Sequence, residues 1–300
     1  MTQSEAARLK TSRRGQWLCR VCPSLTLYLA EPPTGAVAKR ALDAYYAVCP
    51  PESRSLVAGS TAPAFSSLLL AKGQDILNEH LDRMNRRKDQ GIVIWDGGVA
   101  ESWTFTIQGV PPEGGKARTS FCQALFPNNV DVESIVRLAT LLANAFPFLS
   151  GHAGYTAQFN AAYKELAFDT IYGWAKRYPG LEAEDLNVTV KYVADAIKGA
   201  NWLTLVGGKL WDRLVEFAKG EPRFAAGVSV IRAAHGVILR AGDYPMLGDR
   251  NRRQWPETYI DVERKLVPIK LADHGEFAGR FEEEAATGAW LRRLLEPTIW

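Results

Sequence analysis

Alternating apolar and polar positions predict an antiparallel β-meander in the first half of the chain. The segment "GIVIWDGGVAESWTFTIQGV" indicates a short apolar strand, a turn at Asp96, Gly97 and Gly98, and a second strand with period-two alternation. "RTSFCQALF" predicts a third strand, and this alternation is typical of a sheet with one wet face. We expect further strands at residues 24–30, 151–160, 201–207 and 263–272, and a hairpin over 228–242 that turns at His235 and Gly236.

Apolar residues spaced three and four positions apart predict amphipathic helices between these strands. A helix over residues 34–50 has Thr34 at its N-cap, and one over 131–146 begins next to Asp131. Further helices are expected at residues 75–89, 163–180, 189–199, 208–220 and 276–295. In the helix over 276–295, four residues are expected to face the core: Phe277, Phe281, Trp290 and Leu294.

The order of these elements favours an α+β fold, with antiparallel β-meanders packed against helices. Each half of the chain contains a hairpin and flanking helices, so a division into two similar halves near residue 150 is compatible with the pattern. Residues 1–20 are polar and basic, and we expect them to form a flexible leader. Residues 21–300 are then expected to form a single α+β domain.

Composition narrows the class of protein. The 300 residues are 47% hydrophobic and 23% charged, which is typical of an ordinary globular protein with a sizeable core. The 36 basic and 33 acidic residues give a net charge of +3, so there is no general electrostatic case for direct nucleic-acid binding. Neither a signal peptide nor an apolar run long enough to span a membrane is visible. We therefore expect a soluble cytoplasmic protein without a membrane contact.

The four cysteines indicate a reducing compartment rather than a disulfide framework. Cys19 and Cys22 form a C-x-x-C pair, but Cys49, Cys122 and the histidines stand far from it along the chain. A structural zinc site needs two more ligands, and a redox motif needs a helix where this sequence predicts a strand. We expect two ordinary half-buried thiols, no metal and no cofactor.

Linear motifs for catalysis are absent from the sequence. It contains no phosphate-binding loop, no dinucleotide fingerprint, no G-x-S-x-G elbow and no H-E-x-x-H. The basic run at 83–88 and the acidic run at 282–284 are interpreted as solvated helix faces. We therefore predict no catalytic residue and no enzyme, although many active sites have no linear signature.

The segment "VILRAGDYPMLGDRNRRQW" begins as an apolar strand and then becomes a loop rich in glycine, aspartate and arginine. Its glycines and Asx residues predict turn architecture, after which arginine and tryptophan, common binding hot spots, are free to project. In the alternative interpretation, which we favour, Asp243 and Asp249 pair with these arginines and fix the loop internally. The candidate partner-binding residues here are Asp243, Tyr244, Asp249, Arg250, Arg252, Arg253 and Trp255.

Several blocks, in order along the chain, resemble the type VI secretion immunity family. They are "WDGGVAESWTFTIQG", "GHAGYTAQF", "IKGANWLTLVG", "VILRAGDYPMLGDRNRR", "TYIDVERKLVPIKL" and "TGAWLRRL". The resemblance implies a non-enzymatic antitoxin that binds a cognate type VI effector toxin. It also implies that this toxin is a nuclease of restriction-endonuclease fold, which the antitoxin neutralises by occluding the active site.

An acidic cluster suggests how a nuclease could be recognised. Glu182, Glu184 and Asp185 follow Pro179 and Gly180, so we expect them on an exposed loop where they mimic phosphates in a basic cleft. Two other functions stay open from the sequence. One is a small-molecule enzyme or ligand-binding protein with a non-linear site, and the other is an adaptor that loads the effector onto the secretion machine.

Overall fold

A computed structural model describes residues 3–59, 65–98, 102–297 and 300 of the chain. Its described strands form one twelve-stranded sheet in the order β11-β12-β10-β8-β2-β7-β6-β5-β3-β4, with β1 paired to β2 and β9 paired to β8. The strands are β1 (Lys10–Arg13), β2 (Gln16–Leu29), β3 (Leu56–Gly59), β4 (Ser66–Ser67), β5 (Gly91–Trp95), β6 (Thr104–Gln108), β7 (Ser120–Leu125), β8 (Phe148–Phe159), β9 (Glu182–Ala183), β10 (Leu203–Gly207), β11 (Val228–Ala233) and β12 (Gly236–Ala241).

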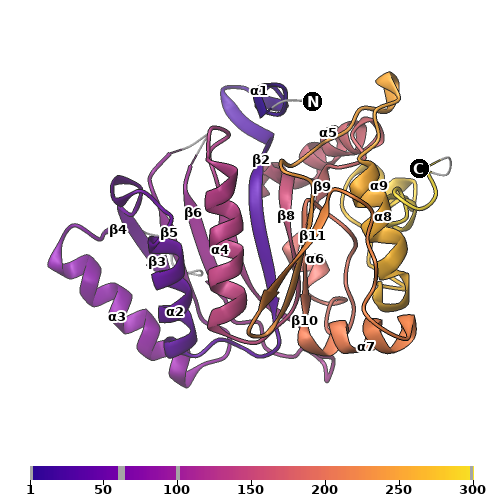
Figure 1. The fold of residues 1–300 in the computed structure, drawn as a ribbon. Helices are drawn as coiled ribbons and strands as arrows, with labels where there is room; N and C mark the ends of the chain where they lie inside the picture. The colour runs from indigo at the N-terminus through magenta and orange to yellow at the C-terminus, as the bar shows by residue number, and fades with distance from the viewer. Residues whose placement is uncertain (1–2, 60–64, 99–101, 298–299) are drawn as a thin grey trace.

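The two longest strands, β2 and β8, lie side by side at the centre of the sheet (Figure 1). They pair antiparallel from Cys19 opposite Phe159 to Leu29 opposite Phe148. Strands β3 to β7 extend the sheet on the β2 side, and β10 to β12 extend it on the β8 side. Each half of the chain therefore builds one wing of a single sheet, and residue 150 lies inside β8.

Helices cover this sheet, and several begin where the sequence predicts. Thr34 caps α2 through the Val37 N–H, and Asp131 caps α4 through the Glu133 N–H. Helix α2 packs between α3 and α4 in front of the sheet (Figure 1). The helices are α1 (Gln3–Ala6), α2 (Gly35–Tyr46), α3 (Ala71–Arg86), α4 (Val132–Ala145), α5 (Lys164–Arg177), α6 (Leu186–Thr189), α7 (Gly208–Ala218), α8 (Glu257–Leu266), α9 (Arg280–Glu283) and α10 (Thr287–Leu291), with 3-10 turns η1 (Pro51–Ser53), η2 (Ala161–Tyr163), η3 (Arg250–Arg252) and η4 (Val267–Ile269).

Two hydrophobic cores hold the layers together. The larger one joins apolar residues of the central strands to α2, α3, α4, α7 and α8. The smaller one joins α5, β9 and the C-terminal segment, where Phe277, Phe281 and Trp290 are fully buried as predicted. Because both cores draw on β2 and β8, the central pair of strands belongs to each of them.

Three expected elements differ from the observed ones. Residues 263–272, expected as a strand, instead finish α8 and form η4. The helix expected over 276–295 is interrupted by Ala285, whose φ of 48° separates α9 from α10. The helix expected over 189–199 is not observed, because the short helix α6 ends at Thr189.

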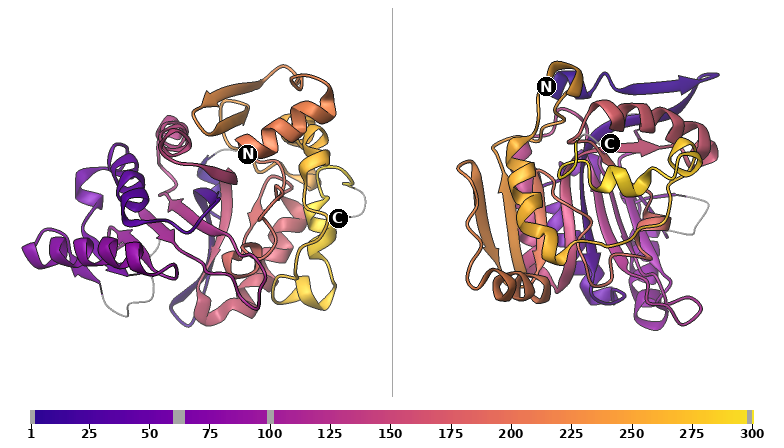
Figure 2. Two further views of the ribbon diagram at one scale, coloured as in Figure 1. Left: turned by 90° about the horizontal axis from the view of Figure 1, so that it is seen from below. Right: turned by 90° about the vertical axis from the view of Figure 1, so that its right-hand side faces the viewer.

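The segment expected to be a flexible leader adds structure to the sheet. Within it, β1 pairs with β2, and Ala6 is fully buried in the smaller core. Figure 2 shows this segment lying along the end of the sheet from two further directions. Ala6 and Leu9 pack in the smaller core and account for the attachment, but two apolar residues are too few to form a periodic pattern.

Candidate functional site

The loop that joins β12 to α8 contains the candidate partner-binding residues, and it is fixed from within. The Asp249 carboxylate is buried and accepts hydrogen bonds from two nitrogens of Arg177, Nε at 3.2 Å and Nη2 at 2.8 Å. It also accepts the Asn251 N–H at 3.0 Å, which starts η3. Gly248 precedes it with φ of 68°, where a Cβ atom would lie 2.8 Å from the Gln254 carbonyl oxygen.

Arg250 ties the same loop to the end of the chain. Its guanidinium donates to the carbonyl oxygens of Trp300 and of Pro297, the latter at 3.2 Å. It also lies over the Trp255 ring, 5.9 Å from the ring centroid. Arg250 and Trp255 are therefore used largely inside the molecule, in agreement with the interpretation of this motif as turn architecture.

The aspartates pair with arginines only in part as expected. Asp249 lies 3.7 Å from Arg252 Nε, so one predicted pair is present although Arg177 is the main partner. Asp243 instead offers its main-chain carbonyl to Arg240 at 2.9 Å. Arg177 lies 72 residues before Asp249, and no local pattern in the sequence predicts it.

Four of the candidate residues stay exposed on this loop: Asp243, Tyr244, Arg252 and Arg253. Tyr244 is 68% exposed, which is high for a large side chain. Arg253 has a positive φ of 56°, and it follows directly on η3. The loop thus presents two guanidinium groups and one aromatic ring on a backbone that Asp249 and Arg250 hold in place.

The expectation that Glu182, Glu184 and Asp185 lie on an exposed loop is wrong. All three are buried, each at most 4% exposed. Asp185 caps α6 through the Asn187 N–H and lies 2.6 Å from Lys164 Nζ. In this structure the three carboxylates do not reach the surface, so they are not placed to mimic phosphates.

Glu182 and Glu184 instead belong to a buried ionic cluster, together with His152, Lys198 and Arg293. Lys198 Nζ lies 2.6 Å from Glu182 and 3.6 Å from Glu184, while His152 Nε2 lies 3.4 Å from Glu184. Arg293 Nη2 lies 3.5 Å from Glu182 and also donates to the Leu181 carbonyl oxygen. Buried charges persist only when paired in this way.

Charges within the buried ionic cluster decide its protonation states. Burial alone raises the pKa of Glu184, but His152 and Lys198 outweigh it and hold that pKa well below the usual range. The same balance lowers the pKa of Glu182, with Lys198 as the strongest opposing charge. Tyr28 and Thr26 on β2 donate hydrogen bonds to Glu184, so both carboxylates stay ionised at neutral pH.

A second ion pair extends this cluster toward α8. Glu263 accepts from Lys270 and from the Ala200 N–H at 2.5 Å, and Lys270 donates in turn to the Leu291 carbonyl oxygen. The opening between Glu263, Glu182 and Lys198 has a volume of about 10 Å³. That is close to the smallest space that admits one water molecule, so a substrate does not fit there in this structure.

The blocks that carry the family resemblance meet at this cluster. "GHAGYTAQF" contributes His152, "IKGANWLTLVG" contributes Lys198, "TYIDVERKLVPIKL" contributes Glu263 and Lys270, and "TGAWLRRL" contributes Arg293. None of these five residues was predicted from the sequence as a functional residue. The available signal was a charged residue placed within each largely apolar block, because such a charge needs a buried partner.

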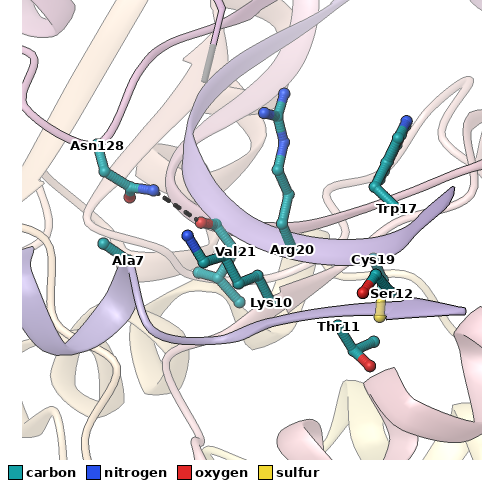
Figure 3. Close-up of a pocket in the computed structure, with 9 residues that line it drawn as sticks. All are labelled: Ala7, Lys10, Thr11, Ser12, Trp17, Cys19, Arg20, Val21 and Asn128. Atoms are coloured by element: carbon teal, nitrogen blue, oxygen red, sulfur yellow. Dashed lines mark hydrogen bonds between the residues drawn. The ribbon is translucent and has the colours of Figure 1, made fainter. Parts of the chain in front are cut away.

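Another opening, of about 490 Å³, lies where β1 pairs with β2 (Figure 3). Arg20, Lys10 and Trp17 line it, and the Arg20 guanidinium lies 5.7 Å from the centroid of the Trp17 ring. Asn128 closes one side by donating to the Val21 carbonyl oxygen at 3.2 Å. Burial raises the pKa of the Cys19 thiol to about 12, so this thiol is a poor nucleophile at neutral pH.

In the part of the chain that the structure describes, no group of three or more His, Cys, Asp or Glu side chains is placed to hold a metal ion. No helix within the described ranges combines the length and the apolar character that crossing a membrane requires.

Comparisons with known proteins place the chain in a family. One solved structure with the same fold is described as "Pseudomonas aeruginosa T6SS protein PA0821", with a TM-score of 0.76 and 18% sequence identity over 97% of this chain and 90% of that one. No curated protein matches the chain significantly. The model of the TsiV family, described as "Type VI immunity for VRR-NUC", matches residues 100–294, which is more than half of the chain. The chain therefore belongs to the TsiV family of type VI immunity proteins.

Proposed function

We propose that this protein binds a cognate type VI effector nuclease of the VRR-NUC class and neutralises it by covering its active site. The nuclease would have the restriction-endonuclease fold, and the encounter would take place in the cytoplasm, where the DNA of the cell lies. Inhibition would come from occupying a surface and not from catalysis. Membership of the TsiV family supports the class of partner.

The fixed loop between β12 and α8 is the observation on which the proposed contact surface rests. Because Asp249 and Arg250 already hold this loop, little conformational entropy remains to be lost when a partner binds. Arg252, Arg253 and Tyr244 are exposed on it, and these residue types dominate binding hot spots. Metal-dependent nucleases hold their ions with carboxylates, and guanidinium groups pair well with carboxylates.

A co-expression experiment tests the proposal. Cells would express the cognate effector nuclease together with the wild-type protein, with the double variant Arg252→Glu/Arg253→Glu, or with the control Arg86→Glu/Arg137→Glu. The control changes the same charges at exposed helix positions on α3 and α4. We expect survival with the wild type and the control and loss of protection with the loop variant.

The same experiment distinguishes the proposal from its alternatives. The cells lack a secretion apparatus, so an adaptor that only loads the effector would bind it without preserving survival. Equal killing with and without the wild-type protein, despite normal expression, would overturn the neutralising function. Full protection by the loop variant would overturn the contact surface alone.

A further inference from the structure

An open apolar groove lies between the C-terminal ends of α7 and α8. Its volume is about 960 Å³, and Leu214, Phe217, Val267 and Pro268 contribute apolar side chains. Phe217 is 71% exposed and Val267 is 51% exposed, unlike most large apolar side chains of this chain. Exposed apolar groups gathered at one place are typical of an interaction site.

The apolar stripe of α7 shows why Phe217 stands out. Leu210 and Leu214 are buried against the larger core, and Phe217 follows at the next helical spacing. The core ends before this residue, so the stripe continues into the groove, where Phe217 stays largely exposed. A helix stripe that extends past its own core is suited to packing against another polypeptide.

Four cations surround this apolar groove: Lys219, Arg223, Arg264 and Lys265. All four are exposed, and none forms an ion pair with any residue that the structure describes. The carboxylate that lines the groove, Glu221, pairs with Arg232 on β11. The groove therefore presents an excess of positive charge over an apolar floor.

Helix geometry explains part of this charge and leaves the rest unexplained. Arg264 and Lys265 occupy the last turn of α8, where the helix dipole favours cations. The dipole gives no reason for Phe217 and Val267 to be exposed beside them. The combination of apolar and cationic groups matches a partner segment that is apolar on one face and acidic on the other.

We propose that this groove binds an acidic amphipathic segment of the effector nuclease. The inference rests on the proposed function, and it adds a second contact and the chemistry of its occupant. Helix α8 has ten residues, so the groove at its C-terminal end and the fixed loop before its N-terminus are separated by about 15 Å along the helix axis. One partner is able to cover both ends, because a standard interface buries about 800 Å² on each side.

Titration calorimetry with the purified cognate effector nuclease tests the inference. Two groove variants separate its components, Phe217→Ser/Val267→Ser for the apolar floor and Arg264→Glu/Lys265→Glu for the cationic rim. Matched controls are Leu69→Ser, an apolar residue that is 84% exposed elsewhere, and Arg86→Glu/Arg137→Glu. Thermal unfolding of every variant would confirm that the fold is retained.

We expect each groove variant to bind the effector about tenfold to a hundredfold more weakly, and the controls to match the wild type. Only the charge-reversed variant should also show a weaker salt dependence of binding, because the cations of the fixed loop remain. If the wild type binds and both groove variants bind equally well, the inference fails while the proposed function stands. If the wild type does not bind the effector, the proposed function fails first.

Two further probes distinguish the occupant. Duplex DNA and vesicles containing phosphatidylserine would be titrated with the wild type and the charge-reversed variant. Negligible binding of both probes supports a protein occupant. Binding of either probe that the charge reversal abolishes, with the effector affinity unchanged, would overturn the inference in favour of nucleic acid or a membrane.

Discussion

Lys198 Nζ lies 2.6 Å from the Glu182 carboxylate, and both side chains are about 5% exposed. Replacing Lys198 with Met would remove the strongest opposing charge from Glu182 and one of the two opposing charges from Glu184. We expect the free energy of unfolding to fall by about 3–5 kcal/mol, as urea titration would measure. The control Lys39→Met breaks an exposed pair with Asp43 and should cost less than about 1 kcal/mol. Equal effects of the two variants would contradict the structural role of the buried ionic cluster.

His274 should make the stability of the protein depend on pH. Burial, assisted by the charge of Lys198, lowers the pKa of this histidine to about 4, whereas an unfolded histidine has a pKa near 6.5. The unfolded chain then binds the proton first, so stability is complete above about pH 6.5 and falls as the pH drops toward 4. The loss is expected to reach roughly 3 kcal/mol at most.

The variant His274→Gln provides the control for this pH dependence. Glutamine keeps an amide that is able to bond with Thr189 and the Gly275 carbonyl oxygen, the present partners of the ring, but it does not titrate. Urea titrations at pH 7, 5.5 and 4 should show a flatter profile for this variant between pH 6.5 and 4. An unchanged slope would assign the acid sensitivity to other groups.

Asp249 should matter for the order of the loop and for effector binding. Asp249→Ala removes both the bonds from Arg177 and the cap of η3, and we expect a loss of about 1–2 kcal/mol in the free energy of unfolding. Hydrogen exchange over residues 250–254 should accelerate, and the affinity for the effector should fall with it. Asp75→Ala, at an exposed position on α3 away from this loop, should change neither measurement.

The C-x-x-C pair should be chemically inert in the folded protein. Cys19 and Cys22 are fully buried in β2 and lie three positions apart, so an extended strand separates their Cα atoms by about 10 Å. A disulfide requires less than about 7 Å. We expect no labelling by a maleimide at pH 7 without denaturant, complete labelling of the cysteines in urea, and no disulfide after mild oxidation. Rapid labelling of the native protein would show that β2 opens locally.

Local patterns were enough to predict the elements whose burial alternates regularly. The meander of β5, β6 and β7 followed from period-two alternation, and Phe105 and Ile107 are buried as that pattern requires. The hairpin of β11 and β12 followed in the same way. The prediction for α8 was wrong, because the expected strand began at Glu263 and left out Tyr259 and Ile260, which start the buried helical face.

The buried ionic cluster could not be predicted from the sequence for a different reason. Glu182 and Glu184 look like surface residues because they are charged and follow a turn. Their burial depends on Lys198 and on Arg293, which is 111 residues away from Glu182. A single sequence records each charge but not which distant charge compensates it. The expected exposed loop was wrong for this reason, whereas the turn that precedes it was local and correctly placed.

The central position of β2 and β8 has a consequence for synthesis of the chain. Ser24 pairs with Gly154, so the open side of β2 has no neighbour until more than half of the polypeptide has left the ribosome. Glu182 gains its ion pair with Arg293 only when translation is nearly complete. A chain that stops before β8 therefore lacks the central pair of strands. A chain that stops before Arg293 lacks one of the positive charges that compensate Glu182. Under the proposed function, only completed copies of the chain protect the cell.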